Sequence, residues 1–228
     1  MIPKPTLKLS FFFLLLFSAL NGFCQDHYDL SSLKNIPFVA DTAVSVFNDQ
    51  VKTGAIEPIT QSQNELEIRC YTFYNVSKMA RILVISGNKD KMEAKVISIT
   101  HTDNKLSPKT GLTFIGHIPS WGNTYTRRYF VKPKESWEQI MNGLIANGLF
   151  SLQSEAALYG KYHLTTANFP LSHYLKLDGA MVIYEVKYNN KIRNIVYHSI
   201  GENTKPSLLS IPEFVKQEKL LDILSSIH

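Results

Sequence analysis

The chain has 228 residues, of which 44% are hydrophobic and 11% aromatic, and its formal net charge at pH 7 is +5. With no low-complexity tract, this composition predicts one sizeable hydrophobic core, or two small cores that share an interface. The lysines are scattered rather than clustered, so the charge does not indicate a nucleic-acid-binding surface.

The first 24 residues are typical of a secretory signal. Lys4 and Lys8 precede an unbroken apolar run, Phe11 to Phe17, which is shorter than the roughly 20 residues of a transmembrane helix. We therefore expect cleavage after Cys24 and export to the periplasm or the medium. The alternative is a lipid anchor on Cys24, which is disfavoured because Phe23 stands where lipoproteins place a small residue.

Residues 25–64 are predicted to form an N-terminal arm. Apolar residues recur at helical spacing after Asp41, which predicts a short helix from there to Val51, and residues 53–64 are predicted to be a loop. Cys70 is the one cysteine left after cleavage and cannot close an internal disulfide. No later apolar stretch has the length of a transmembrane segment.

Residues 65–228 are predicted to form one α+β domain with a mostly antiparallel sheet. Apolar and polar residues alternate along "ELEIRCYTFYN", and the segments "MARILVIS" and "KMEAKVISIT" flank the turn "GNKDK", so these three strands form a meander. The segments "LTFIGHI" and "TYTRRYFV" predict two further strands.

Two amphipathic helices are predicted, at 136–147 and at 211–226. The first begins with a capping box of Ser136 and Gln139, and the second with Ser210 and Glu213. Each helix has a single apolar stripe, so we expect both to cover one face of the sheet. Residues 150–176 between them keep no steady period and predict a long excursion.

The segment "LDGAMVIYEVKYNNKIRNIVYHSIG" predicts a β-hairpin whose turn is Asn189 and Asn190. This register places Glu185 opposite Asn194, on the face that Arg193 does not share. His198 lies four residue pairs from Glu185, about 13 Å along the strand, so no acid–base pair forms within the hairpin.

The other face of this hairpin is the predicted binding surface. It carries residue types that are enriched at binding hot spots, namely Tyr184, Tyr188, Arg193 and Tyr197. We expect Tyr188, nearest the turn, to be exposed; the alternative is that this face belongs to the core. Arg127, on a strand face with Tyr125 and Tyr129, is a second candidate for binding an anionic or planar ligand.

The sequence contains no recognisable catalytic motif. It has no G-x-S-x-G, no glycine-rich phosphate loop and no H-E-x-x-H, and its seven histidines lack the spacings that hold zinc. We therefore predict no metal and no cofactor. Glu185, His163 and His173 remain as acid or base candidates, although the sequence supplies no partner for Glu185.

The order of the segments "NELEIRCYTF", "ESWEQIMNGLIANGLFSLQSE" and "LDGAMVIYEVKYNNKIRNIVYHS", followed by an amphipathic helix, resembles the layout of a family of exported Bacteroidota proteins. The resemblance covers the chain from about Glu65. It implies export, and no catalytic role accompanies it.

The sequence thus favours an exported, non-catalytic binding module whose partner is an envelope protein or a small ligand. One alternative is a periplasmic hydrolase with a site near residues 150–200. Another is a secreted inhibitor or immunity-type protein. Neither the partner nor the oligomeric state is predicted.

Overall fold

The computed structural model describes residues 27–39, 55–74, 79–89, 91–118, 122–162, 180–197 and 210–227. Several sequence predictions lie outside these ranges: the signal segment with Cys24, the helix at 41–51, and the three histidines His163, His173 and His198.

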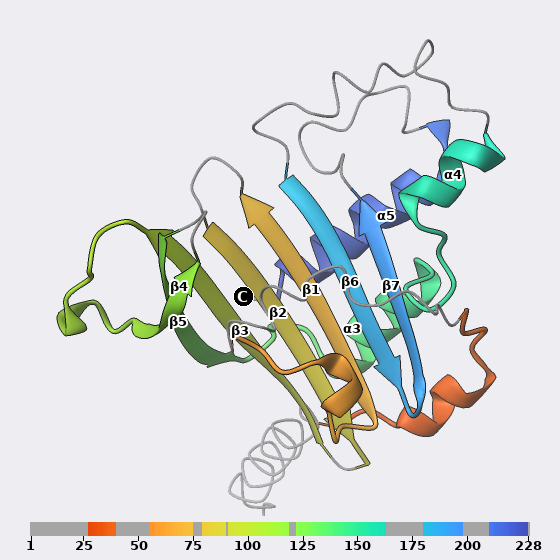
Figure 1. Cartoon of the computed structure of the whole chain (residues 1–228). Helices are drawn as coiled ribbons and strands as arrows, with labels where there is room; N and C mark the ends of the chain where they lie inside the picture. The colour runs from red at the N-terminus through yellow and green to blue at the C-terminus, as the bar shows by residue number, and fades with distance from the viewer. Residues whose placement is uncertain are drawn as a thin grey trace, which may run out of the picture.

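The described residues form a seven-stranded antiparallel sheet with helices on one face, which confirms the α+β prediction (Figure 1). The strand order is β4-β5-β3-β2-β1-β6-β7. The bounds are β1 Leu66–Tyr74, β2 Met79–Asn88, β3 Lys91–Thr102, β4 Thr113–Ile118, β5 Gly122–Val131, β6 Ala180–Tyr188 and β7 Lys191–Tyr197. The predicted meander is β1-β2-β3, and β1 pairs on its other side with β6.

Helices α3 (Trp137–Ala146), α4 (Glu155–Lys161) and α5 (Pro212–Ser225) lie on one side of the sheet, called here the helix face (Figure 1). The capping box of α3 is present as predicted, since Ser136 accepts from the Gln139 backbone N–H at 3.2 Å. Gly148, with φ 77°, takes the left-handed conformation that follows the end of this helix. The helices and the sheet enclose the main hydrophobic core.

The capping box predicted for α5 is wrong. The N-cap residue is Ile211 rather than Ser210, and the Ile211 side chain makes no capping hydrogen bond. Glu213 instead accepts hydrogen bonds from Lys161 Nζ at 2.6 Å and from the Tyr162 hydroxyl at 2.8 Å. This carboxylate therefore joins the start of α5 to the end of α4, a contact between segments that are distant in the sequence.

The β6–β7 hairpin has the predicted register. Asn189 has φ 52° in the turn, and Glu185 lies opposite Asn194 while Val186 lies opposite Arg193. Side chains of β6 alternate between the two faces of the sheet, so Glu185 points to the face that the helices leave free, called here the outer face.

Residues 55–64 cross the outer face and include the short 3₁₀ helix η2, Ile59–Gln61 (Figure 1). Ala55 and Ile56 belong to a second, smaller core with Tyr71 and Ile97 of the outer face. The predicted loop is thus packed on the sheet by apolar side chains. Nearer the N-terminus, the 3₁₀ helix η1, Leu30–Asn35, buries Leu30 and Leu33 in the main core.

Candidate ligand-binding cavity on the outer face

The tyrosine-bearing face of the β6–β7 hairpin is core. Tyr184, Tyr188, Arg193 and Tyr197 are 0%, 7%, 2% and 0% exposed. The three tyrosines belong to the main hydrophobic core. The expectation that Tyr188 is exposed is wrong, because η1 packs on that end of the hairpin and its Leu30 carbonyl accepts from the Tyr188 hydroxyl at 3.1 Å.

The polar ends of the other residues on this face also have internal partners. The Tyr184 hydroxyl accepts from Gln217 at 2.5 Å, the Tyr197 hydroxyl donates to the Gln153 carbonyl at 2.6 Å, and the Arg193 guanidinium donates to the Leu152 carbonyl. The alternative of a core face therefore explains these four residues, and they offer no open surface.

Arg127 is exposed on β5, and its guanidinium carbon lies 5.8 Å from the centre of the Tyr129 ring. Strand β5 is separated from β6 by β3, β2 and β1. At about 4.8 Å per strand, the structure does not bring Arg127 together with the tyrosines of the hairpin.

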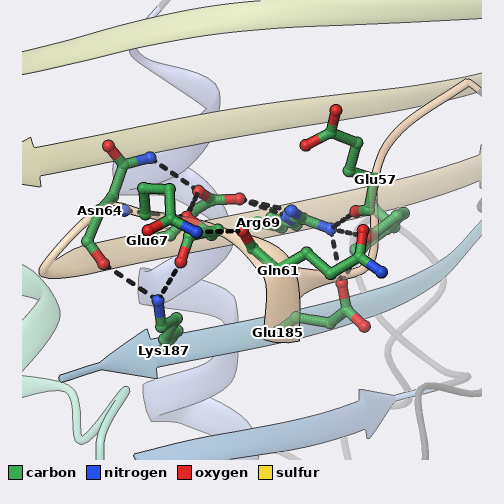
Figure 2. A network of polar contacts seen from close by, with 10 residues as sticks. Glu57, Gln61, Asn64, Glu67, Arg69, Glu185 and Lys187 are labelled. Atoms are coloured by element: carbon green, nitrogen blue, oxygen red, sulfur yellow. Dashed lines mark hydrogen bonds and ion pairs between the residues drawn. The ribbon is translucent and has the colours of Figure 1, made fainter. Parts of the chain in front are cut away.

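Glu185 has partners that sequence reasoning missed. Its Oε2 atom accepts a short hydrogen bond from the Tyr71 hydroxyl and lies 3.5 Å from Arg69 Nη1. Both partners come from β1, where Arg69 is directly opposite Glu185 in the β1–β6 pairing. Arg69 lies at the centre of a polar network on the outer face, with Glu185 among its partners (Figure 2).

A second carboxylate lies on the other side of the same guanidinium. Glu67 Oε1 is 2.6 Å from both Nε and Nη2 of Arg69. Arg69, Glu67 and Glu185 are only 2%, 5% and 2% exposed. A buried charge is costly unless it is paired. Both buried carboxylates therefore depend on the Arg69 guanidinium as their cation.

The network also holds the 55–64 segment on the sheet. Arg69 Nη1 donates to the Glu57 carbonyl at 2.7 Å, and Glu67 Oε2 accepts from Asn64 Nδ2 at 2.8 Å and from the Ser62 hydroxyl. The Lys187 ammonium donates to the carbonyls of Ser62 and Asn64. Figure 2 shows these bonds converging between the segment and strands β1 and β6.

The environment fixes the protonation of two of these groups. Burial alone raises the pKa of Glu67, but the charge of Arg69 and the hydrogen bonds to the carboxylate outweigh it and hold this pKa below its usual value. Burial, followed by the nearby Glu185 charge, raises the pKa of Tyr71 far above its usual value. Glu67 is thus ionised near neutral pH, and Tyr71 remains a hydrogen-bond donor.

The strand registers place Arg69 in a lateral row that crosses the outer face. Val84 of β2 lies opposite Arg69, Lys95 of β3 lies opposite Val84, and Phe130 of β5 lies opposite Lys95. Arg69 and Lys95 are therefore two strands apart, about 10 Å between backbones, on the same face of the sheet.

A cavity of about 440 Å³ lies between this row and the 55–64 segment. The sheet contributes Glu67, Arg69, Lys95, Ile97 and Arg128 to its lining. The 55–64 segment contributes the rest, including the amide side chains of Gln61, Gln63 and Asn64. Its size lies within the range of about 300–1,000 Å³ typical of small-molecule sites, and its polar groups come from several elements.

A larger hollow of about 1070 Å³ lies at the end of the sheet where the β2–β3 and β6–β7 turns meet residues 60–65. Most of its lining side chains are exposed, and the Lys187 ammonium is already bound to two carbonyls. The cavity on the outer face lies between the sheet and the 55–64 segment and is lined by the buried charges of Glu67 and Arg69. It is therefore the stronger candidate for a ligand-binding site.

The described residues contain no group of three or more potential ligands that holds a metal ion. Burial raises the pKa of the Cys70 thiol to about 12, so this free cysteine is not a reactive thiolate. None of the helices in the described ranges has the length and hydropathy needed to cross a bilayer. The chain matches no protein-family model, no curated protein and no solved structure.

Proposed function

We propose that the chain is an exported, non-catalytic binding module that takes a small polar molecule into the cavity on the outer face. The observation that carries this proposal is the cavity itself, which is closed on one side by charged side chains of β1, β3 and β5 and on the other by residues 55–64. Export is supported by the N-terminal residues, with their basic start and short apolar run.

The volume of the cavity favours a small ligand over an envelope protein as the partner. A folded partner binds through a surface of about 800 Å² on each side, and it cannot enter a cavity of about 440 Å³. A stoichiometric protein captured from the envelope, independent of this cavity, would instead support the inhibitor or immunity-type alternative.

The hydrolase alternative uses Glu185, His163 or His173 as its acid or base, and of these three Glu185 is the one within the described residues. This carboxylate now has the partners Tyr71 and Arg69, but it is 2% exposed and does not line the cavity, so a substrate in the cavity does not touch it. Turnover of a hydrolase substrate panel that Glu185→Gln abolishes without lowering stability would favour the enzyme. Turnover that survives this change would exclude Glu185 as its acid or base.

The binding proposal is tested by purifying the chain, expressed with its own N-terminal segment, from the cell envelope and recording native mass spectra. We expect a small molecule to remain bound at near-stoichiometric occupancy. Gln61→Trp, which adds a bulky ring to an exposed residue of the cavity wall, should abolish its retention. Thr60→Trp is the matched control, because exposed Thr60 does not line this cavity.

A chain that retains no small molecule contradicts the proposal. Retention that is unchanged by Gln61→Trp would place the ligand elsewhere and contradict the assignment of the site.

A further inference from the structure

The two sides of the outer-face cavity differ in charge. On the β1 side, the positive charge of Arg69 is matched by the carboxylates of Glu67 at 2.6 Å and Glu185 at 3.5 Å. These three charges are buried and bound to one another, so this side has no positive charge available for a ligand.

The β3 side contains a lysine without such a match. Lys95 is half-buried and forms no hydrogen bond or ion pair with any residue in the described ranges. Glu93, the nearest acid on the same face of β3, accepts from Lys91 Nζ at 3.0 Å. Glu57, which also lines the cavity, is exposed to water. Lys95 therefore lines the cavity and has a charge that no described residue pairs with.

Arg128 of β5 adds a second positive charge beside Lys95. Lys95 lies opposite Phe130, and Arg128 is two residues along the same strand, so Lys95 and Arg128 are diagonal neighbours on the outer face. Diagonal neighbours have side-chain origins about 7–8 Å apart, which lets two long side chains reach one group. Arg128 Nη2 donates to the Ala55 carbonyl at 2.8 Å, a neutral acceptor that fixes the guanidinium at the cavity wall.

We propose that the ligand carries an anionic oxygen group, a carboxylate or a phosphate. This inference rests on the proposed binding function. Lys95 and Arg128 bind this group at the β3–β5 side. The amides of Gln61, Gln63 and Asn64 contact hydroxyl or amide groups of the same molecule at the other side. Lysine and arginine together suit such a group, since one supplies a point charge and the other a planar fork of donors.

The test uses three pairs of probes that differ in the anionic group: D-glucuronate and D-glucose, glucose 6-phosphate and glucose, and L-glutamate and L-glutamine. Binding to the full chain is measured by calorimetry at low and high salt. We expect at least one anionic compound to bind at least tenfold more tightly than its neutral partner, and to bind more weakly at high salt.

Lys95→Gln should weaken binding of that anionic compound about tenfold, which is the scale of one lost charge-assisted hydrogen bond, and leave any neutral compound unaffected. Lys134→Gln is the matched control, because it removes the same charge from an exposed residue that does not line the cavity. Urea unfolding of both variants checks that their folds are intact.

Two results overturn the inference and leave the proposed function standing: equal affinity for the charged and neutral members of every pair, or an affinity for the anionic compound that Lys95→Gln does not change. Absence of binding by all anionic compounds also overturns it. The native mass spectra described above then decide separately whether the cavity binds a small molecule at all.

Discussion

Arg69 of β1 lies directly opposite Glu185 of β6, with Nη1 of the guanidinium 3.5 Å from Oε2 of the carboxylate. Both side chains are 2% exposed. The same guanidinium also contacts Glu67 and the Glu57 carbonyl, so it joins the middle of the sheet to the segment that covers the cavity. One residue thus supports the sheet, the covering segment and the cavity wall.

Removing this guanidinium should be strongly destabilising. In Arg69→Met, two buried carboxylates lose their cation while the volume of the site is largely kept, and we expect a loss of about 3–5 kcal/mol in the free energy of unfolding. Urea denaturation measures this change. Lys95→Met is the control on the same face, because Lys95 has no ion pair among the described residues, and it should cost less than about 1 kcal/mol. If Arg69→Met and Lys95→Met lower stability equally, then the two buried carboxylates do not depend on the Arg69 guanidinium.

The Tyr71 hydroxyl is the second partner of Glu185, and its removal tests the buried hydrogen bond. Tyr71→Phe keeps the ring but leaves Glu185 Oε2 without this donor, so stability should fall by about 1–3 kcal/mol. Tyr129→Phe is the control, since Tyr129 is 39% exposed, and should be nearly neutral. A Tyr71→Phe protein as stable as the parent would show that the carboxylate does not depend on this hydroxyl.

The carboxylate of Glu67 should make the protein sensitive to acid. Its pKa in the folded state is below the usual value of 4.5, so the unfolded chain binds a proton at a higher pH than the folded chain. The stability that Glu67 contributes is then present above about pH 4.5 and is lost as the pH falls through the folded-state pKa.

Glu67→Gln should therefore reduce the slope of unfolding free energy against pH below 4.5. Some slope should remain, because the pKa of Glu213 is also lowered: the bonds from Lys161 and Tyr162 outweigh its burial. The measurement is a series of urea unfolding curves between pH 2.5 and 7, with exposed Glu138→Gln as the control. An unchanged acid slope in Glu67→Gln would argue against the ionised pair with Arg69.

The sequence was sufficient to predict the structural features that depend on residues close together in the chain. The turn residues Asn189 and Asn190 determine the register of the β6–β7 hairpin, and Ser136 with Gln139 marks the start of α3. The alternation along β1 also places Glu67, Arg69 and Tyr71 on one face of that strand. These patterns are local, so short-range stereochemistry determines them.

The contacts that were missed depend on which distant segments meet. Pairing of β1 with β6 brings Arg69 to Glu185, and no periodicity in either strand specifies this partner. The burial of Tyr188 depends on η1, whose place beside the hairpin turn is likewise not encoded in local spacing. The charged residues Glu65, Glu67 and Arg69 on one face of the first predicted strand were the one sign of a buried partner, since such residues seldom lie inside a sheet unpaired.

Gln217 offers a test of a polar pair in the main core. It is 0% exposed, donates to the Tyr184 hydroxyl at 2.5 Å, and its Oε1 atom has no hydrogen-bond partner in the described structure. Replacing both groups, in Tyr184→Phe with Gln217→Leu, should be nearly neutral or stabilising, because the unpaired oxygen is removed. Tyr184→Phe alone should cost about 1–2 kcal/mol by leaving a second amide atom unpaired. A double variant less stable than that single variant would contradict this interpretation.

The burial of Tyr188 predicts a loss of stability rather than of binding. The ring is 7% exposed in the main core, and its hydroxyl donates to the Leu30 carbonyl. Tyr188→Ala should therefore cost about 3–5 kcal/mol, because the change leaves a cavity as well as removing the buried ring. Such a loss lowers the melting temperature of a chain of this size by about 10 °C.

Two further variants separate the contributions of the ring and the hydroxyl. Tyr188→Phe keeps the ring and should cost only about 1 kcal/mol, the net value of one hydrogen bond. Phe130→Ala truncates a ring that is 73% exposed and should leave the melting temperature within about 2 °C of the parent. If Tyr188→Ala melts like the Phe130→Ala control, then η1 does not cover the hairpin turn in solution, and Tyr188 returns as an exposed candidate for binding.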